Sequence, residues 1–272
     1  MSAIRLTPRR VEKVWGRRDL PAAFGSVAPD AEPVGEIWFE DPRGGRPALL
    51  IKYLFTSEKL SVQVHPDDAL AREQGLPSGK DEAWFVLAAE PGAVIGLGLT
   101  HAVDKATLRS AALDGTIEGL VDWRPVHAGE TFYSAAGTVH AIGPGLQLVE
   151  VQQNADVTYR LYDYGRPREL HLEEAVAAAH PVPWREPDRP GEPILAKGGK
   201  FTLERRRGPH SSGLDASPAR PAWLIPLQGG GSVDGAVLEA GEVWLVEGRV
   251  SLELDLRADV LVAHLPGDAP AT

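Results

Sequence analysis

A short strand pattern near the first quarter of the chain carries residue types that bind metal ions. It runs from Ser61 to His65 and stops before a proline. Side chains alternate along a strand, so Ser61, Gln63 and His65 share one face and two valines share the other. A hydroxyl, an amide and an imidazole therefore stand in a row. A polar face exposed to water would look the same, so this segment alone leaves both interpretations open.

Two more residues fit the same chemistry. Glu82 shares a predicted strand face with Trp84 and Val86, and a carboxylate on such an apolar face needs a partner. His140 lies on another predicted strand, beyond a glycine-bracketed turn. Together with Gln63 and His65 they offer imidazole nitrogens and oxygens, a set that suits zinc. Spacing cannot show that these strands converge, and a single strand histidine is often structural.

Lys52 interrupts a nearly continuous apolar run over residues 47–55, which predicts a buried strand. A lysine in a buried strand must either extend to the surface or face a polar cavity. The run alone does not choose between the two.

Residues 146–152 and 157–163 are expected to form a hairpin around residues 153–156. With that turn, Glu150 lies opposite Arg160, at the Cβ separation of about 4.5–5.5 Å that is typical of cross-strand pairs. The pair is either a structural ion pair or part of a site.

Bulk composition limits the partners. The 272 residues carry a net charge of −10, with a pI of about 5.3, so a nucleic acid partner is not expected. The absence of cysteine excludes disulfides and thiolate metal sites. No run approaches the roughly 20 apolar residues of a membrane span, and the N-terminus lacks the apolar core of a signal peptide. We therefore expect a cytoplasmic protein without a membrane partner.

The 29 glycines and 23 prolines, with few long helical patterns, favour short strands joined by turns. Short helices are predicted over residues 67–74 and 171–180. We expect an all-β chain with a catalytic domain over residues 1–180, which includes a helical insert near 101–121. We then expect a Pro-rich linker over 181–199. It would be followed by a C-terminal β domain over 200–272, a degenerate barrel half without metal.

Several motifs together resemble a known family. The segment from Gly129 to His140 is similar to the second cupin motif, with Ala135 where proline is usual. The segments 61–68 (SVQVHPDD), 79–84 (GKDEAW) and 158–166 (TYRLYDYGR) look like class I mannose-6-phosphate isomerases of the compact bacterial form. The resemblance covers roughly residues 5–175. Ile142 departs from it, because some members carry a tyrosine there.

The resemblance implies cupin or jelly-roll β-barrels and a zinc-dependent isomerase, one zinc ion per chain, that interconverts mannose 6-phosphate and fructose 6-phosphate through an enediolate. Carried over to this sequence, the metal ligands are Gln63, His65, Glu82 and His140. Lys52, Ser61, Lys80 and Arg160 become substrate-binding candidates, and Glu150, Arg160 and Lys80 become catalytic candidates. Glu150 is expected to be the base, as the pocket carboxylate not assigned to zinc.

Two other functions remain open. A non-catalytic metal-binding sensor of sugar phosphates would keep the metal and the cations but need no base. Another cupin metalloenzyme, such as an iron oxygenase, would need a redox metal with open coordination positions. For the isomerase we expect a small sugar-phosphate substrate and a monomer or homodimer.

Overall fold

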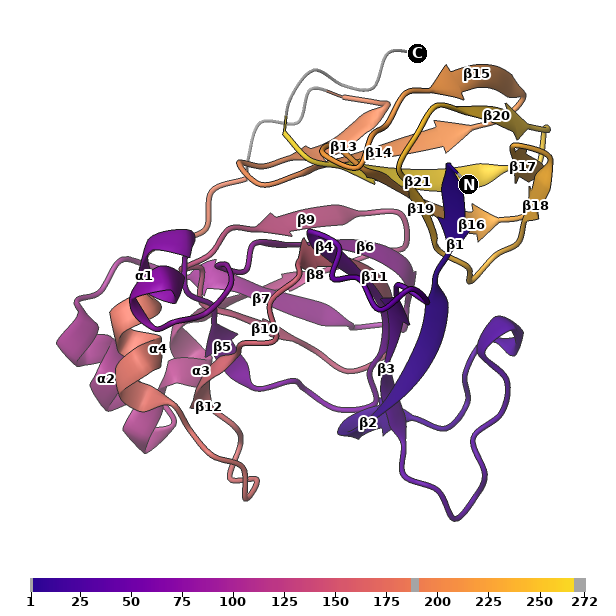
Figure 1. Cartoon of the computed structure of the whole chain (residues 1–272). Helices are drawn as coiled ribbons and strands as arrows, with labels where there is room; N and C mark the ends of the chain where they lie inside the picture. Colours follow the sequence, from indigo (N-terminus) through magenta and orange to yellow (C-terminus); the bar gives the residue numbers. More distant parts are fainter. Residues whose placement is uncertain (1, 187–190, 267–272) are drawn as a thin grey trace.

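The computed structural model of the protein describes residues 2–186 and 191–266 (Figure 1). Residues 187–190 of the predicted linker and residues 267–272 of the predicted C-terminal domain lie outside the described residues. Four antiparallel sheets dominate the structure. The expected all-β architecture is confirmed.

Two sheets form the first barrel. In spatial order, the central sheet contains β2 (Thr7–Arg17), β3 (Val34–Glu40), β4 (Leu49–Phe55), β11 (Leu146–Gln153), β6 (Glu82–Ala89) and β9 (Thr131–Ser134). The outer sheet contains β12 (Tyr159–Tyr162), β5 (Val62–Val64), β10 (His140–Ile142), β7 (Val94–Leu99) and β8 (Val121–Pro125). An apolar cluster that includes Trp84, Leu148 and Ile95 joins their facing sides.

Helices cover the far side of the outer sheet, at the left of Figure 1. They are α1 (Asp68–Glu73), α2 (Lys105–Asp114), α3 (Ile117–Leu120) and α4 (Leu172–Ala178), with a 3₁₀ turn η1 (Ala22–Phe24) elsewhere. The predicted helices are confirmed with shorter bounds. Asp67 caps α1 by accepting a hydrogen bond of 2.8 Å from the Leu70 amide, which satisfies one of the free donors of the first turn.

Leu108 of α2 and Ile117 of α3 share one apolar cluster with Val62 and Val64 of β5. Both valines are 0% exposed. The alternation predicted for β5 is therefore confirmed: its apolar face is covered by helices. Within the described residues, no helix is long and apolar enough to cross a membrane.

Two more sheets form the C-terminal unit, at the top right of Figure 1. The C-terminal inner sheet contains β1 (Ala3–Arg5), β19 (Trp244–Val246), β16 (Ala222–Gln228), β21 (Asp259–His264), β14 (Thr202–Arg207) and β13 (Ile194–Lys197). The C-terminal outer sheet contains β15 (His210–Leu214), β20 (Val250–Leu254), β17 (Gly231–Val233) and β18 (Ala236–Leu238). Strands β1 and β13 thus join the C-terminal unit, although the sequence placed them in the first domain and the linker.

The central sheet packs against the C-terminal inner sheet. Ile51, Tyr53 and Phe55 of β4 share one apolar cluster with Trp223 and Leu261 of the C-terminal unit. Each side chain of this kind contributes about 1.5–3 kcal/mol when it is buried. Because β4 has the barrel interior on its other face, all seven of its residues are buried. This explains the continuous apolar run that surrounds Lys52.

The predicted hairpin over residues 146–163 is wrong. Strand β11 pairs with β4 and β6, whereas β12 pairs with β5 in the opposite sheet. Glu150 is registered with Lys52 and Trp84, and Arg160 with Gln63. After β11 the chain turns away, because the Asn154 amide donates to Ala48 and its side chain to Pro47. The apolar pattern of β11 fits pairing with β12 as well as pairing with β4 and β6, so the sequence could not distinguish these arrangements.

Candidate metal centre and active site

Three strands bring ligand atoms together inside the first barrel. The Nε2 atoms of His65 and His140 lie 3.3 Å and 3.4 Å from Glu82 Oε2. One ligand atom from each of the three residues fits within a group 4.8 Å across. His65 follows β5, Glu82 opens β6 in the facing sheet, and His140 opens β10 beside β5. The facing sheets therefore bring these three side chains together, which their spacing in the sequence could not establish.

Gln63 lies beside this group. It is registered with His140, and its amide Nε2 lies 3.2 Å from His140 Nε2. Its Oε1 accepts a hydrogen bond of 3.0 Å from the Ser61 hydroxyl. A half-turn of the amide exchanges its two ends, and the hydroxyl can accept as well as donate. The amide oxygen can therefore face the cluster without loss of the Ser61 contact.

Burial sets the protonation of these groups. It lowers the pKa of His65 to about 3 and also lowers the pKa of His140, which keeps both imidazoles neutral. For Glu82, burial is opposed by Lys80 and His65, which hold the pKa of the carboxyl well below its usual range. Two neutral imidazoles and a carboxylate are the forms in which these residues bind a cation.

The residues fit a zinc ion on two observations. Glu82 Oε2 is buried without a hydrogen-bond partner, so it can serve as a ligand atom. The Nδ1 atom of His140 lies 2.9 Å from the carbonyl of Thr138, which leaves Nε2 with its lone pair toward the cluster. Two nitrogens and two oxygens match the ligands that zinc takes in proteins.

A pocket opens beside this cluster between the two sheets of the first barrel. Its walls are Lys13, Trp15, Glu36, Trp38, Lys52, Leu54, Leu60, Ser61, Gln63, Lys80, Glu82, Glu150, Asp156, Thr158, Arg160 and Arg168. All the candidate residues inferred from the sequence line it, except His65 and His140, which belong to the adjoining metal-ligand group. Lys13 and Arg168 were not predicted, because only contacts between distant segments place them in the pocket wall.

Lys52 and Glu150 form a buried ion pair on the pocket wall. Lys52 Nζ lies 2.9 Å from Glu150 Oε2, and Trp84 Nε1 donates to Glu150 Oε1 at 2.9 Å. Burial alone would lower the pKa of the Lys52 ammonium, but Glu150, Glu36 and Glu82 outweigh it and raise that pKa. Burial also raises the pKa of the Glu150 carboxyl, although Lys52 opposes the rise. The lysine in the buried strand therefore faces the cavity.

Lys80 reaches the cluster itself, with its Nζ 2.8 Å from Glu82 Oε1 and 3.3 Å from His65 Nε2. Arg160 differs from both lysines. Within residues 2–186 and 191–266, its guanidinium makes no ion pair and has only a long hydrogen bond of 3.5 Å to the Glu169 carbonyl. Burial and the neighbouring Arg168 lower the pKa of Arg160. Arg160 is thus a pocket cation that can accept an anionic partner.

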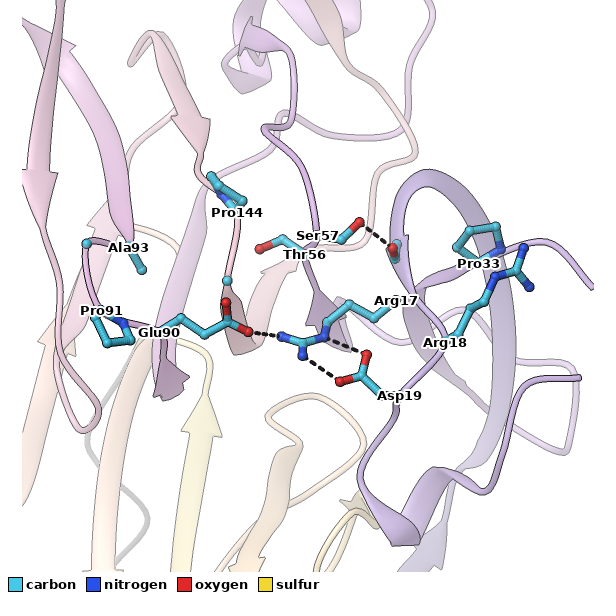
Figure 2. Close-up of a pocket in the computed structure, with 13 residues that line it drawn as sticks. Arg17, Arg18, Asp19, Pro33, Thr56, Ser57, Glu90, Pro91, Ala93 and Pro144 are labelled. Carbon is cyan, nitrogen blue, oxygen red and sulfur yellow. Dashed lines mark hydrogen bonds and ion pairs between the residues drawn. The ribbon is translucent and has the colours of Figure 1, made fainter. Parts of the chain in front are cut away.

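A second pocket shows what an ordinary surface hollow looks like (Figure 2). Arg17 lies in it, with NH2 2.6 Å from Asp19 and NH1 2.7 Å from Glu90. Ser57 donates to the Gly16 carbonyl at 2.7 Å. None of its described lining residues has a buried polar atom without a partner. The charge of Arg17 is thus neutralised by two carboxylates, whereas Arg18 bonds only to backbone carbonyls among the described residues.

Comparison with known proteins gives a consistent assignment. No family model matches the chain. The mannose-6-phosphate isomerase of Streptococcus mutans is 35% identical in an alignment of 203 residues, and the match covers 61% of this chain and 64% of that protein. The Bacillus subtilis protein YvyI, which carries a provisional mannose-6-phosphate isomerase name, is 35% identical in an alignment of 217 residues, and the match covers 65% of this chain and 68% of that protein. The alignments thus span about two thirds of these relatives.

Solved structures extend the similarity to the C-terminal unit. The crystal structure of mannose 6-phosphate isomerase from Bacillus subtilis has a TM-score of 0.80 and 26% identity, and the match covers 97% of this chain and 100% of that one. A zinc-bound mannose 6-phosphate isomerase shares the fold at a TM-score of 0.68 and 16% identity, covering 98% of this chain and 100% of that one. The chain belongs to the mannose-6-phosphate isomerase family.

Proposed function

We propose that the protein is a zinc-dependent aldose–ketose isomerase that interconverts mannose 6-phosphate and fructose 6-phosphate. The observation that supports this most is one pocket that joins a buried metal-ligand group, the buried carboxylate of Glu150, and the guanidinium of Arg160, which has no ion pair among the described residues. The names of the relatives in Streptococcus mutans and Bacillus subtilis support the same activity.

The reaction moves a proton between adjacent carbons. A base takes the proton from C2 of the open-chain aldose, which gives an enediolate, and returns it to C1, while a proton passes from O2 to O1. Atoms and charge balance without an oxidant or reductant. One base that reaches both carbons and donors near both oxygens are required.

Glu150 is our candidate for the base. Elimination does not select it, because the carboxylates of Glu36 and Asp156 also line the pocket. It is 4% exposed, and Lys52 and Trp84 each hold one of its oxygens. Burial raises the proton affinity of this carboxyl, while the adjacent ammonium favours the ionised form that can accept a proton. Lys80 is a second proton-transfer candidate, because its ammonium lies 2.8 Å from Glu82 beside the cluster.

The ligands of one zinc ion per chain would be Gln63, His65, Glu82 and His140. A bound zinc ion would polarise the sugar oxygens as a Lewis acid. A structural relative crystallised with zinc supports this choice of metal. The chain's own contribution is the neutral state of the two imidazoles and the anionic state of Glu82.

The phosphate needs a cation that is free to bind it. We propose Arg160 as the first contact, because Lys52 and Lys80 already pair with carboxylates. A guanidinium also matches phosphate oxygens with two parallel hydrogen bonds. Ser61, Lys52 and Lys80 would then contact the sugar, and binding at the phosphate would position the reacting carbons.

A coupled assay tests the proposal. Purified protein should convert mannose 6-phosphate to fructose 6-phosphate, lose that activity after chelation, and regain it with zinc. A sensor would bind the sugar phosphate without turnover, and an iron oxygenase would consume oxygen. Full turnover by metal-free protein would refute the zinc requirement.

Compartment and assembly are further parts of the proposal. We infer a cytoplasmic enzyme that acts as a monomer or homodimer without nucleic acid or membrane partners. The net charge of −10 opposes binding to polyanions. Cell fractionation and sedimentation velocity would test these assignments.

A further inference from the structure

A turn of the C-terminal unit reaches back to the segment that carries Lys80 and Glu82. This turn, residues 198–200, joins β13 to β14. It lies directly on the ring of Tyr133 in β9: a Cβ atom on Gly198 would lie 1.8 Å from Tyr133 Cζ and 2.0 Å from its oxygen. The ring of Phe201 lies on Tyr133 as well, with centroids 5.1 Å apart. Only glycine permits so close an approach.

Tyr133 in turn holds Asp81, the residue between Lys80 and Glu82. Its hydroxyl donates to Asp81 Oδ2 at 2.6 Å, and the Ala136 amide donates to Asp81 Oδ1 at 3.0 Å. Asp81 is 6% exposed, so this carboxylate is an internal anchor. Lys80 and Glu82 line the pocket, whereas Tyr133 holds the carboxylate of Asp81 between them. Fixing Asp81 therefore fixes the backbone from which Lys80 and Glu82 reach the pocket.

Lys200 provides a second connection. Its Nζ lies 2.5 Å from Asp68 Oδ2, and Asp68 Oδ1 accepts the Gly79 amide at 2.7 Å and Gln153 Nε2 at 3.1 Å. Gln153 Oε1 also accepts the Asp81 amide at 3.0 Å. Gly79 and Asp81 of the segment 79–82 are therefore attached to groups that the turn contacts.

We propose that the 198–200 turn is a positioning element, and that Lys200 and Tyr133 fix the segment 79–82 so that Glu82 and Lys80 enter the site at the required place. The inference rests on the proposed function for its catalytic consequence. It gives the C-terminal unit, whose described residues contribute none of the pocket lining, a role in the site.

The test compares Lys200→Met and Tyr133→Phe with the control Lys197→Met. Lys197 is exposed on the same hairpin and makes no ion pair within the described ranges. Hydrogen exchange by mass spectrometry should be several-fold faster over residues 79–82 in both test variants and unchanged in the control. Zinc affinity, measured by competition with a chelator, should fall about 10–100-fold, as for other groups that orient metal ligands. Lys200→Arg should restore both.

The lysine side chain is 38% exposed, so Lys200→Met should leave the melting temperature near that of the wild type. If both test variants match the control in exchange and zinc affinity, the proposal is wrong. If only Tyr133→Phe has an effect, the turn is not the positioning element. These readouts need no turnover, so a wild type that binds zinc but does not isomerise the sugar would refute the function and leave the positioning role standing.

Discussion

The two β units each bury charged side chains, but they use them differently. In the C-terminal unit, Glu204 Oε1 lies 3.0 Å from His264 Nε2, and Glu204 Oε2 lies 3.2 Å from Arg206 NH2. Both carboxylate oxygens therefore have partners. In the first barrel, Glu82 Oε2 is buried without a hydrogen bond and has two imidazole nitrogens beside it.

A buried charge is thus not by itself a functional site. The described residues contain one group of acidic or imidazole side chains that could hold a metal, and it is the group with the open ligand atom. In the C-terminal unit, the contact between Glu204 and His264 follows from strand pairing, since these residues lie on the neighbouring strands β14 and β21. The first-barrel group requires two facing sheets.

Removing one histidine from each unit should give the largest difference in zinc content and activity between two variants. His140→Ala should lose bound zinc and reduce kcat/KM by at least about 10³-fold, because a Lewis acid contributes several kcal/mol. His264→Ala should retain zinc and turnover. Metal analysis and the coupled assay measure both. Equal zinc content in the two variants would contradict the contrast.

Glu150→Gln should retain zinc and lower kcat by about 10²–10⁴-fold, because the amide cannot accept the proton. Steady-state kinetics on zinc-loaded protein would measure the loss. Near-normal turnover would exclude Glu150 as the base and direct attention to Lys80.

Arg160→Met should raise KM for the sugar phosphate about 10–100-fold, since a hydrogen bond to a charged group is worth about 1.5–3 kcal/mol. Arg17→Met is the matched control, because Arg17 lies in the pocket of Figure 2 and already pairs with Asp19 and Glu90. An unchanged KM in Arg160→Met would remove this residue from phosphate binding.

Glu204→Gln should have the smallest effect, a loss of about 1–3 kcal/mol in unfolding free energy with zinc and turnover intact. Burial raises the pKa of Glu204, but His264 and Arg206 outweigh it and the pKa lies below its usual value. The unfolded chain therefore binds the proton first as the pH falls, and the stabilisation is lost as the pH falls through the folded pKa. The difference in unfolding free energy between wild type and variant should be smaller near pH 3.5 than at pH 7, as measured by thermal unfolding. A constant difference would contradict a role for the ionised carboxylate.

The metal-ligand candidates could be predicted from residue types, whereas Lys80 and the roles of Lys52, Glu150 and Arg160 were implied by the family resemblance. Alternation placed Gln63 and His65 on one face, and an apolar strand made Lys52 and Glu82 conspicuous. The pairing of Glu150 could not be predicted, because β11 presents the same apolar pattern to either neighbour. Lys13 and Arg168 were missed because nothing in their local sequence distinguishes them from surface cations.

The sequence by itself determined the strands, the capped helices and the chemical inventory of the site, because these depend on periodicity and on residue type. Tertiary structure decided which strands face one another, and so which donors converge and which charges neutralise. It also brought Lys200 to Asp68 across 132 positions. Such contacts depend on the packing of one sheet upon another, which local patterns of polarity do not specify.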